Sequence, residues 1–221
     1  MIVVIDGPSG SGKSSIAKAV SNRLGIQYLD SGALYRAVTW IWLESGEHED
    51  RILDILENRE IHFDSKGDRF SVRVDGKEIS REIRSQRISH QVGKMARRRD
   101  VRDFVNKRMR DAVRTGFWIA DGRDLGSVVF PKAELKIFMD APLELRAGRR
   151  YKELVESGED VTLDEITASL RDRDQADRER SEDPLVKPDD AVTIQNEGIS
   201  FDEQVLELAT MIQTRIDKQK Q

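Results

Sequence analysis

One segment constrains the fold of this chain more than any other: residues 7–14 read Gly-Pro-Ser-Gly-Ser-Gly-Lys-Ser. The segment matches the pattern G-x-x-x-x-G-K-[ST], and it follows the apolar run 2–5 with only Asp6 between them. Its glycines let backbone N–H groups converge on phosphate oxygens, and the helix that begins at the loop favours the same anion at its N-terminus. A strand, this loop and a helix in that order predict a phosphate-binding P-loop, rather than a glycine-rich connection of another α/β protein.

Two side chains of this loop suit a nucleoside triphosphate. Lys13 supplies a catalytic cation for the β- and γ-phosphates, and we expect it to be exposed at the loop; the Ser14 hydroxyl can ligate Mg²⁺. Asp121 is the candidate for a carboxylate that contacts the Mg²⁺ through water, the alternative being a cap of the turn before Gly122. The loop residues predicted to bind ATP are Gly7, Pro8, Ser9, Gly10, Ser11, Gly12, Lys13, Ser14 and Ser15.

Composition narrows the class of protein. The 221 residues suffice for one well-packed domain with mobile appendages, and a net charge of −4 disfavours non-specific nucleic-acid binding. The absence of cysteine excludes disulfides, thiolate nucleophiles and Cys-ligated metals. No apolar run approaches the ~18 residues of a membrane span, and Asp6 interrupts the first one too early for a signal peptide. We therefore expect a cytoplasmic protein without a membrane or nucleic-acid partner, and we expect a monomer.

Short apolar runs alternate with helical patterns along the chain. The candidate strands are 2–5, 26–29, 117–120, 135–139 and 191–194. This alternation predicts an α/β fold, a five-stranded parallel sheet with helices on both faces. The first helix is predicted over 13–24, before Gly25, and the last begins at Ser200, which can form a capping box with Glu203. The buried stripe predicted for the last helix is Val205, Leu208 and Ile212.

Residues 60–84 interrupt the alternation of strands and helices. Runs at 61–63, 70–74 and 77–79 alternate apolar and polar residues, with turns predicted at 65–68 and 75–76. The pattern predicts a small antiparallel β insertion. Three short strands are marginal alone, so the insertion must lean on the main body or move with a substrate.

Three further segments carry polar side chains suited to a ligand. Residues 30–36 read Asp-Ser-Gly-Ala-Leu-Tyr-Arg and residues 119–124 read Ile-Ala-Asp-Gly-Arg-Asp, each at the end of a predicted strand. In α/β proteins, ligands bind outside the carboxyl ends of the strands. Arg173, Asp177 and Arg180 are spaced to share one helix face and converge on one ligand, although such pairs alone are usually solvated ion pairs.

Taken together, these motifs resemble the bacterial-type cytidylate (CMP) kinases of the nucleoside monophosphate kinase group. The resemblance covers nearly the whole chain. It includes the P-loop, the segment 30–36, the β insertion, Glu-Ile-Arg at 82–84, the segment 119–124, Val-Val-Phe-Pro at 128–131, Lys-Ile-Phe-Met-Asp-Ala at 136–141, and the 173–180 helix. This set in this order is specific, because other P-loop kinases of similar size share only the first motif.

The resemblance implies roles on the acceptor side of the reaction. Arg36 would hold the nucleotide phosphate, while Arg102 and Asp124 would read the base: a carboxylate accepts hydrogen bonds from the cytosine amino group but repels the carbonyl that uracil has there. Asp177 would accept from a ribose hydroxyl, and Gly93 stands where the family commonly carries a serine beside the base. The residues implied in CMP binding are Ser31, Tyr35 (with a core role as the alternative), Arg36, Gly93, Arg102, Arg123, Asp124, Arg173, Asp177 and Arg180.

The resemblance also implies a helical lid that closes over the phosphates. Arg146, Arg149 and Arg150 would lie at its start, where one or more of them should reach the transferring phosphoryl group, whose developing charge needs cations. The implied catalytic residues are Lys13, Arg123, Arg149 and Arg173, with Arg149 and Arg150 also on ATP. A single kinase domain would then comprise a core (1–30, 115–145 and 181–221), an NMP-binding region with the β insertion (31–114) and a lid (146–180).

The expected activity is phosphorylation of CMP, and of dCMP, by ATP with Mg²⁺. A kinase for another small acceptor such as UMP is the alternative within enzymes, and Asp124 argues against a uracil preference. An RNA- or ribosome-associated P-loop GTPase is the alternative from another class, suggested by the basic stretch 97–110. No N-K-x-D base-reading motif of GTPases is present, and the stretch can also be an arginine-rich solvated helix face.

Overall fold

A five-stranded parallel sheet forms the centre of the computed structural model, which describes residues 1–195 and 198–219. The strand order is β2-β6-β1-β7-β8, with β1 in the middle. The bounds are β1 Ile2–Asp6, β2 Gln27–Asp30, β6 Trp118–Gly122, β7 Leu135–Asp140 and β8 Val192–Gln195. The predicted strands and the predicted α/β class are confirmed, with strand ends that differ by one or two residues.

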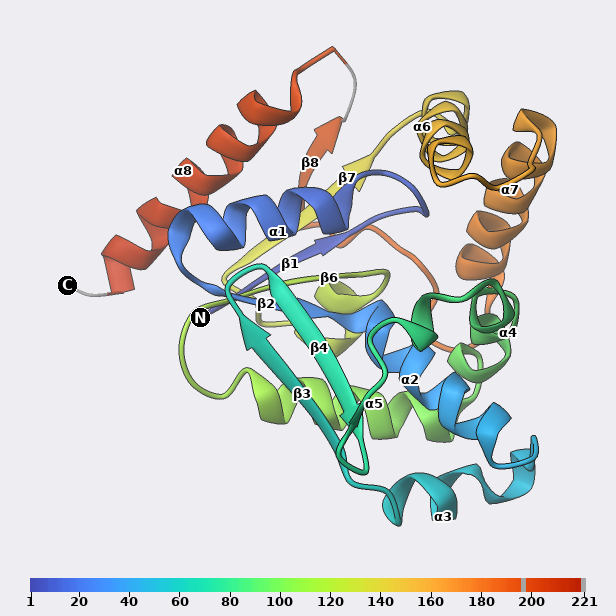
Figure 1. The fold of residues 1–221 in the computed structure, drawn as a ribbon. Coiled ribbons are helices and arrows are strands. Elements are labelled where there is room, and N and C mark those ends of the chain that lie inside the picture. The colour runs from blue at the N-terminus through green and yellow to red at the C-terminus, as the bar shows by residue number, and fades with distance from the viewer. Residues whose placement is uncertain (196–197, 220–221) are drawn as a thin grey trace.

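Helices cover both faces of this sheet (Figure 1). On one face lie α1 (Lys13–Leu24) and α8 (Phe201–Gln219); on the other lie α2 (Ser31–Glu44) and α5 (Arg99–Ala112). Side chains alternate along β1, so Val3 and Ile5 pack with α1 and α8 while Val4 packs with α2 and α5. The predicted capping box of Ser200 and Glu203 and the stripe Val205, Leu208 and Ile212 are present in the last helix.

The β insertion is the predicted antiparallel meander: β3 (Ile61–Lys66), β4 (Arg69–Val74) and β5 (Lys77–Glu78). The turn predicted at 65–68 is wrong by two residues, because Gly67 adopts a φ of 61° and closes a two-residue turn after Lys66. The tip of the hairpin leans on the main body. The N–H of Tyr28 donates to Ser65 Oγ at 2.8 Å, and the Ser21 hydroxyl donates to the carbonyl of Gly67 at 3.0 Å.

The remaining helices pack beside α2 and α5 or lie toward the carboxyl ends of the strands (Figure 1). Between α2 and α5 lie the short helices Glu49–Arg51, α3 (Ile52–Glu57) and Glu82–Arg84, followed by α4 (Gln86–Ala96). A single π-helical turn, Leu125–Val129, follows β6, and α6 (Leu143–Glu156) and α7 (Leu163–Glu179) form a helical hairpin. Arg180 is extended (ψ 139°) and lies just beyond α7, so the predicted face of three residues on one helix is wrong for its last member. Within the described residues, no helix is long and apolar enough to cross a membrane.

Candidate active site

The P-loop connects β1 to α1 and has the backbone geometry that its glycines allow. Gly10 and Gly12 have φ values of 75° and 93°, in the left-handed region that other residues avoid. A Cβ on Gly7 would lie 2.0 Å from the carbonyl oxygen of Met139, so no larger residue fits there. The loop therefore turns tightly against β7 before α1 begins at Lys13.

Lys13 is buried, which corrects the expectation that it is exposed. Its ammonium group spans the loop, donating to the carbonyl of Pro8 at 2.5 Å and to Ser11 Oγ at 3.1 Å. Burial, and then the neighbouring charge of Arg123, hold the pKa of Lys13 well below its usual range. The loop thus encloses the ammonium group of Lys13, the cation that the motif predicts for the β- and γ-phosphates.

Ser14 and Asp121, the two predicted Mg²⁺ residues, are in contact although they are 107 residues apart. The Ser14 hydroxyl donates to Asp121 Oδ2 at 2.6 Å, and the Tyr28 hydroxyl donates to Asp121 Oδ1 at 2.5 Å. Burial, and then the charge of Asp30, raise the pKa of Asp121. Oxygen ligands of this kind fit a Mg²⁺ ion. Tyr28 was not anticipated, although a tyrosine in a buried strand needs a partner for its hydroxyl.

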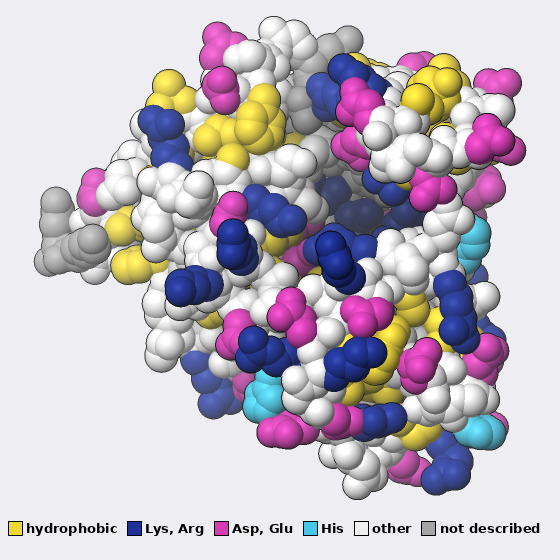
Figure 2. Space-filling model, viewed as in Figure 1, with side chains coloured by type: hydrophobic (Ala, Val, Ile, Leu, Met, Phe, Trp, Pro, Cys, Tyr) yellow, Lys and Arg dark blue, Asp and Glu magenta, His cyan; other side chains and the backbone are white. Residues whose placement is uncertain are grey.

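Several cations lie close to one another in front of the P-loop. Burial and then Arg173 lower the pKa of Arg36 to about 10, and burial and then Arg123 lower the pKa of Arg173. Arg123 is itself the neighbour that lowers the pKa of Lys13. Figure 2 shows dark-blue Lys and Arg side chains inside a hollow beside the lobe that α6 and α7 form. Arg173 is surrounded by protein yet open to water, as a side chain lining a hollow is.

Hydrogen bonds hold two of these arginines in place. Arg36 donates to Ser89 Oγ at 2.8 Å and to the carbonyl of Ile83 at 3.3 Å. Arg123 Nε donates to Asp177 Oδ2 at 2.9 Å, so the carboxylate that the resemblance places on the ribose contacts an arginine in this structure. Arg36 is thus held by uncharged groups and Arg123 by one carboxylate, so the hollow is suited to a polyanion such as a chain of phosphates.

The two expected base readers form a buried ion cluster. Arg102, fully buried, donates to Asp124, and Arg180 Nη2 lies 3.1 Å from the second oxygen of Asp124. The ring of Tyr35 lies 5.6 Å from the Arg102 guanidinium and is part of the hydrophobic core. Tyr35 therefore occupies the core position given above as its alternative, and it also contacts Arg102, one of the two residues expected to bind the base. Asp183, which was not anticipated, also accepts from Arg102.

The lid arginines differ in where they lie. Arg146 is buried against the P-loop, donating to the carbonyl of Ser9 at 2.8 Å and to Asp174 at 2.6 Å. Arg149 and Arg150 are exposed on α6. The positive charge of Arg150 contributes to lowering the pKa of both Arg36 and Arg173, so it lies near the hollow.

Two further predicted acceptor residues, Ser31 and Gly93, differ in burial. The Ser31 hydroxyl is buried and donates to the backbone carbonyl of Asp121 at 2.6 Å. Gly93 is exposed on α4, one turn after Ser89, and a Cβ there would meet nothing within 4 Å. The backbone therefore does not require glycine at position 93.

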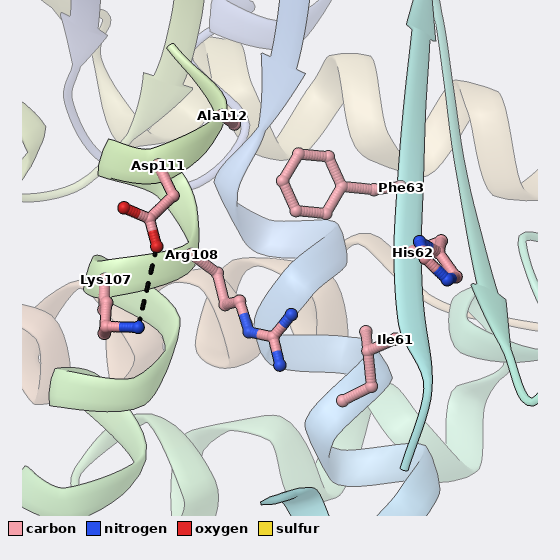
Figure 3. Close-up of a pocket in the computed structure, with 7 residues that line it drawn as sticks. All are labelled: Ile61, His62, Phe63, Lys107, Arg108, Asp111 and Ala112. Atoms are coloured by element: carbon pink, nitrogen blue, oxygen red, sulfur yellow. Dashed lines mark ion pairs between the residues drawn. The ribbon is translucent and has the colours of Figure 1, made fainter. Parts of the chain in front are cut away.

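A second hollow lies between β3 and α5. Figure 3 shows Ile61 and Phe63 of β3 facing Arg108 of α5, with an ion pair of 3.7 Å between Lys107 and Asp111 at one side. It contains none of the predicted site residues.

Comparison with known protein sequences gives one consistent result. The family model described as cytidylate kinase matches residues 3–214. A cytidylate kinase of Clostridioides difficile (strain 630) is 39% identical over 215 residues, covering 96% of this chain and 98% of the relative. One of Fusobacterium nucleatum subsp. nucleatum is 38% identical over 221 residues, covering 100% of this chain and 99% of the relative.

Proposed function

The chain belongs to the cytidylate kinase family, and we propose that its arginine-lined hollow is where the γ-phosphoryl group of ATP is transferred to CMP. ATP is the phosphoryl donor and CMP the acceptor; dCMP is proposed as a second acceptor. Neither alternative raised by the sequence, a UMP kinase or an RNA-associated GTPase, finds support, because the family match is to cytidylate kinases over almost the whole chain.

The observation that carries the proposal is a group of neighbouring cations: the charge of Arg123 lowers the pKa of Lys13 and of Arg173, and the charge of Arg173 lowers the pKa of Arg36. Gathering like charges in a partly buried hollow is unfavourable, and a bound polyanion removes that cost. Phosphoryl transfer needs such cations where charge develops on the transferred group. No protein nucleophile is required, because the residues hold the acceptor oxygen and the γ-phosphate in line.

On the donor side, the P-loop backbone and Lys13 would cradle the β- and γ-phosphates, with Arg149 and Arg150 approaching from α6. Ser14 and Asp121 would hold Mg²⁺, which neutralises phosphate charge when bound. Their oxygens already lie 2.6 Å apart. Tyr28 would keep the Asp121 carboxylate oriented toward Ser14.

On the acceptor side, Arg36 would hold the CMP phosphate, and Arg123 and Arg173 would contact the group in transfer. Arg102 and Asp124 would read the cytosine. The other proposed acceptor contacts are Ser31, Tyr35, Gly93, Asp177 and Arg180. We propose that residues 31–114 form the acceptor-binding region and residues 146–180 the lid, whose first helix already begins at Leu143.

A steady-state assay with matched variants tests this proposal. The protein is offered CMP, dCMP and UMP with ATP or GTP as donor, and the expected order of kcat/KM places CMP above UMP. Arg173→Ala should lower kcat/KM by about 10²–10³, the effect of removing one group that stabilises the transition state. Arg171→Ala, an exposed arginine on the same helix, should leave it unchanged. Equal activity of the two variants would remove Arg173 from the site.

A further inference from the structure

The segment that follows α7 docks on α5 through two consecutive acidic residues. Glu182 Oε2 accepts from Arg99 Nη1 at 2.8 Å, and Asp183 Oδ2 accepts from Arg102 Nε at 2.7 Å. The first pair is on the surface, with side chains 64% and 33% exposed, whereas the second is covered, at 1% and 17%. Exposed ion pairs contribute little to stability, so we expect only the covered pair of Asp183 and Arg102 to stabilise this contact.

Asp183 completes the set of acceptors around Arg102. The three guanidinium nitrogens each have one: Nε donates to Asp183, Nη1 to the carbonyl of Ala96 at 3.1 Å, and Nη2 to Asp124. Buried polar groups that lose a partner carry a desolvation cost, so Asp183 holds the plane of this guanidinium fixed.

The backbone of Asp183 is in the left-handed region, with a φ of 49°. A non-glycine residue there carries a conformational cost that its surroundings must offset. Both polar ends of the residue are engaged, since the carboxylate accepts from Arg102 and the carbonyl oxygen accepts from Arg180 Nε at 2.5 Å. Asp183 thus joins the two arginines that flank Asp124.

The charges around Asp124 balance only when Asp183 is counted. Arg102 and Arg180 contribute two positive charges, and Asp124 and Asp183 contribute two negative charges. Arg180 Nη2 is buried without an aligned acceptor in the described part of the chain, although it lies 3.1 Å from Asp124 Oδ1. Without the Asp183 carboxylate, Asp124 would be the one negative charge of this cluster facing both arginines.

We propose that Asp183 is a positioning residue for base selection. Its carboxylate partly neutralises Arg102, so Asp124 remains able to accept a hydrogen bond from an exocyclic amino group. This inference rests on the proposed function, because it assumes that Asp124 faces the pyrimidine. Loss of the Asp183 charge weakens the acceptor offered to cytosine and also weakens the repulsion of the uracil carbonyl. Both changes lower the preference for CMP.

Asp183→Asn isolates this charge, because asparagine also tolerates a left-handed backbone and keeps the carbonyl that binds Arg180. The matched control is Glu182→Gln, which removes the same charge from the adjacent surface pair. Steady-state kinetics with CMP and UMP should give a CMP:UMP ratio of kcat/KM that is about tenfold lower for Asp183→Asn and unchanged for Glu182→Gln.

Asp183→Gly serves as the second variant, since glycine adopts a φ of 49° without strain and also lacks the carboxylate. It should lower the ratio as Asp183→Asn does, while the KM for ATP stays near the wild-type value. A wild-type ratio in either folded variant overturns the inference. If instead the wild-type protein itself shows no preference for CMP, the proposed function fails, and the two failures are thereby distinguished.

Discussion

At the scale of single residues, the site depends on charged groups that the protein itself buries, without a ligand. Lys13, Asp6, Asp121 and Arg102 are each less than a tenth exposed, and the side chain of each is hydrogen-bonded to a backbone group, a hydroxyl group or a charged partner. Burial of a charge is costly unless hydrogen bonds or opposite charges offset the cost. Substitutions at these positions therefore change stability and catalysis together, and a useful variant must separate the two effects.

Lys13→Met is such a variant. Methionine retains the volume of the buried stem and removes the ammonium group, whereas alanine would also leave a cavity beneath the loop. We expect kcat to fall by about 10²–10³, since the phosphates lose a cation. The free energy of unfolding, measured in urea, should change by no more than about 2 kcal/mol, because a desolvated charge is removed along with its hydrogen bonds. Activity near the wild-type level in this variant would show that Lys13 only stabilises the loop and does not act on the phosphates.

Asp6 gives a prediction about pH. Its carboxylate accepts from the N–H groups of Leu125 and Gly126 at 3.0 and 2.7 Å, yet burial raises the pKa of Asp6 to about 6, against an ordinary 3.8. The folded protein therefore binds a proton that the unfolded chain has released between pH 4 and 6. The stability contributed by that proton is complete below pH 3.8 and is lost as pH rises through 6.

Urea unfolding of the wild type and of Asp6→Asn from pH 4 to 7 measures this effect. The wild type should lose about 3 kcal/mol more than the variant over that range, the amount that corresponds to the pKa difference. Parallel stability curves for the two proteins would contradict the raised pKa.

Sequence reasoning at this scale succeeded where a motif marks a strand end. Ser14 and Asp121 were each a candidate for Mg²⁺ from their motifs, and the two are in hydrogen-bond contact because β1 and β6 are neighbours in the sheet. Tyr28, Asp174 and Asp183 were missed, since their partners are 93, 165 and 81 residues away and no local pattern joins them. The burial of Lys13 was missed because the motif specifies a loop but not how the loop closes over its own lysine.

At the scale of elements, the β insertion supports the donor side of the site. Phe70 of β4 packs edge-on against Tyr28, with ring centroids 6.4 Å apart, and Tyr28 holds Asp121. Alternation of residues predicted the strands, because a strand that covers the main body buries one face only. Which element the buried face would contact was not encoded in that alternation.

Phe70→Ala tests this connection. Removing a partly buried aromatic ring should cost about 2 kcal/mol of stability. It should also raise the Mg²⁺ concentration needed for half-maximal activity, because Tyr28 loses the ring that positions it. Phe63→Ala is the control: Phe63 contacts Phe70, with centroids 5.6 Å apart, and has no ring contact with Tyr28. Equal Mg²⁺ requirements in the two variants would show that the hairpin does not act through Tyr28.

At the scale of the whole molecule, the helical hairpin α6–α7 is attached to the P-loop and to the proposed acceptor region. Asp174 of α7 accepts from the N–H of Ser9 at 3.0 Å and from Arg146 of α6 at 2.6 Å. At the far end of the hairpin, Gln86 of α4 donates to Glu159 at 2.9 Å. The first contact is buried and the second is exposed, so the hairpin is anchored at the P-loop and can open at α4.

Asp174→Asn should loosen the buried anchor and expose the reaction to water. Arg146 would then be buried with a neutral partner, which we expect to cost about 3 kcal/mol of stability and to lower the hydrogen-exchange protection of α6 and α7 together. The kcat for CMP should fall at least tenfold, because lid closure excludes water and aligns the phosphates, while the KM for ATP changes little. Asp172→Asn removes the same charge from an exposed position of α7 and should alter neither quantity. If Asp174→Asn lowered stability yet kept the wild-type kcat, the contact with Ser9 would serve folding alone, and closure of the hairpin over the phosphates would have to depend on the contacts at α4.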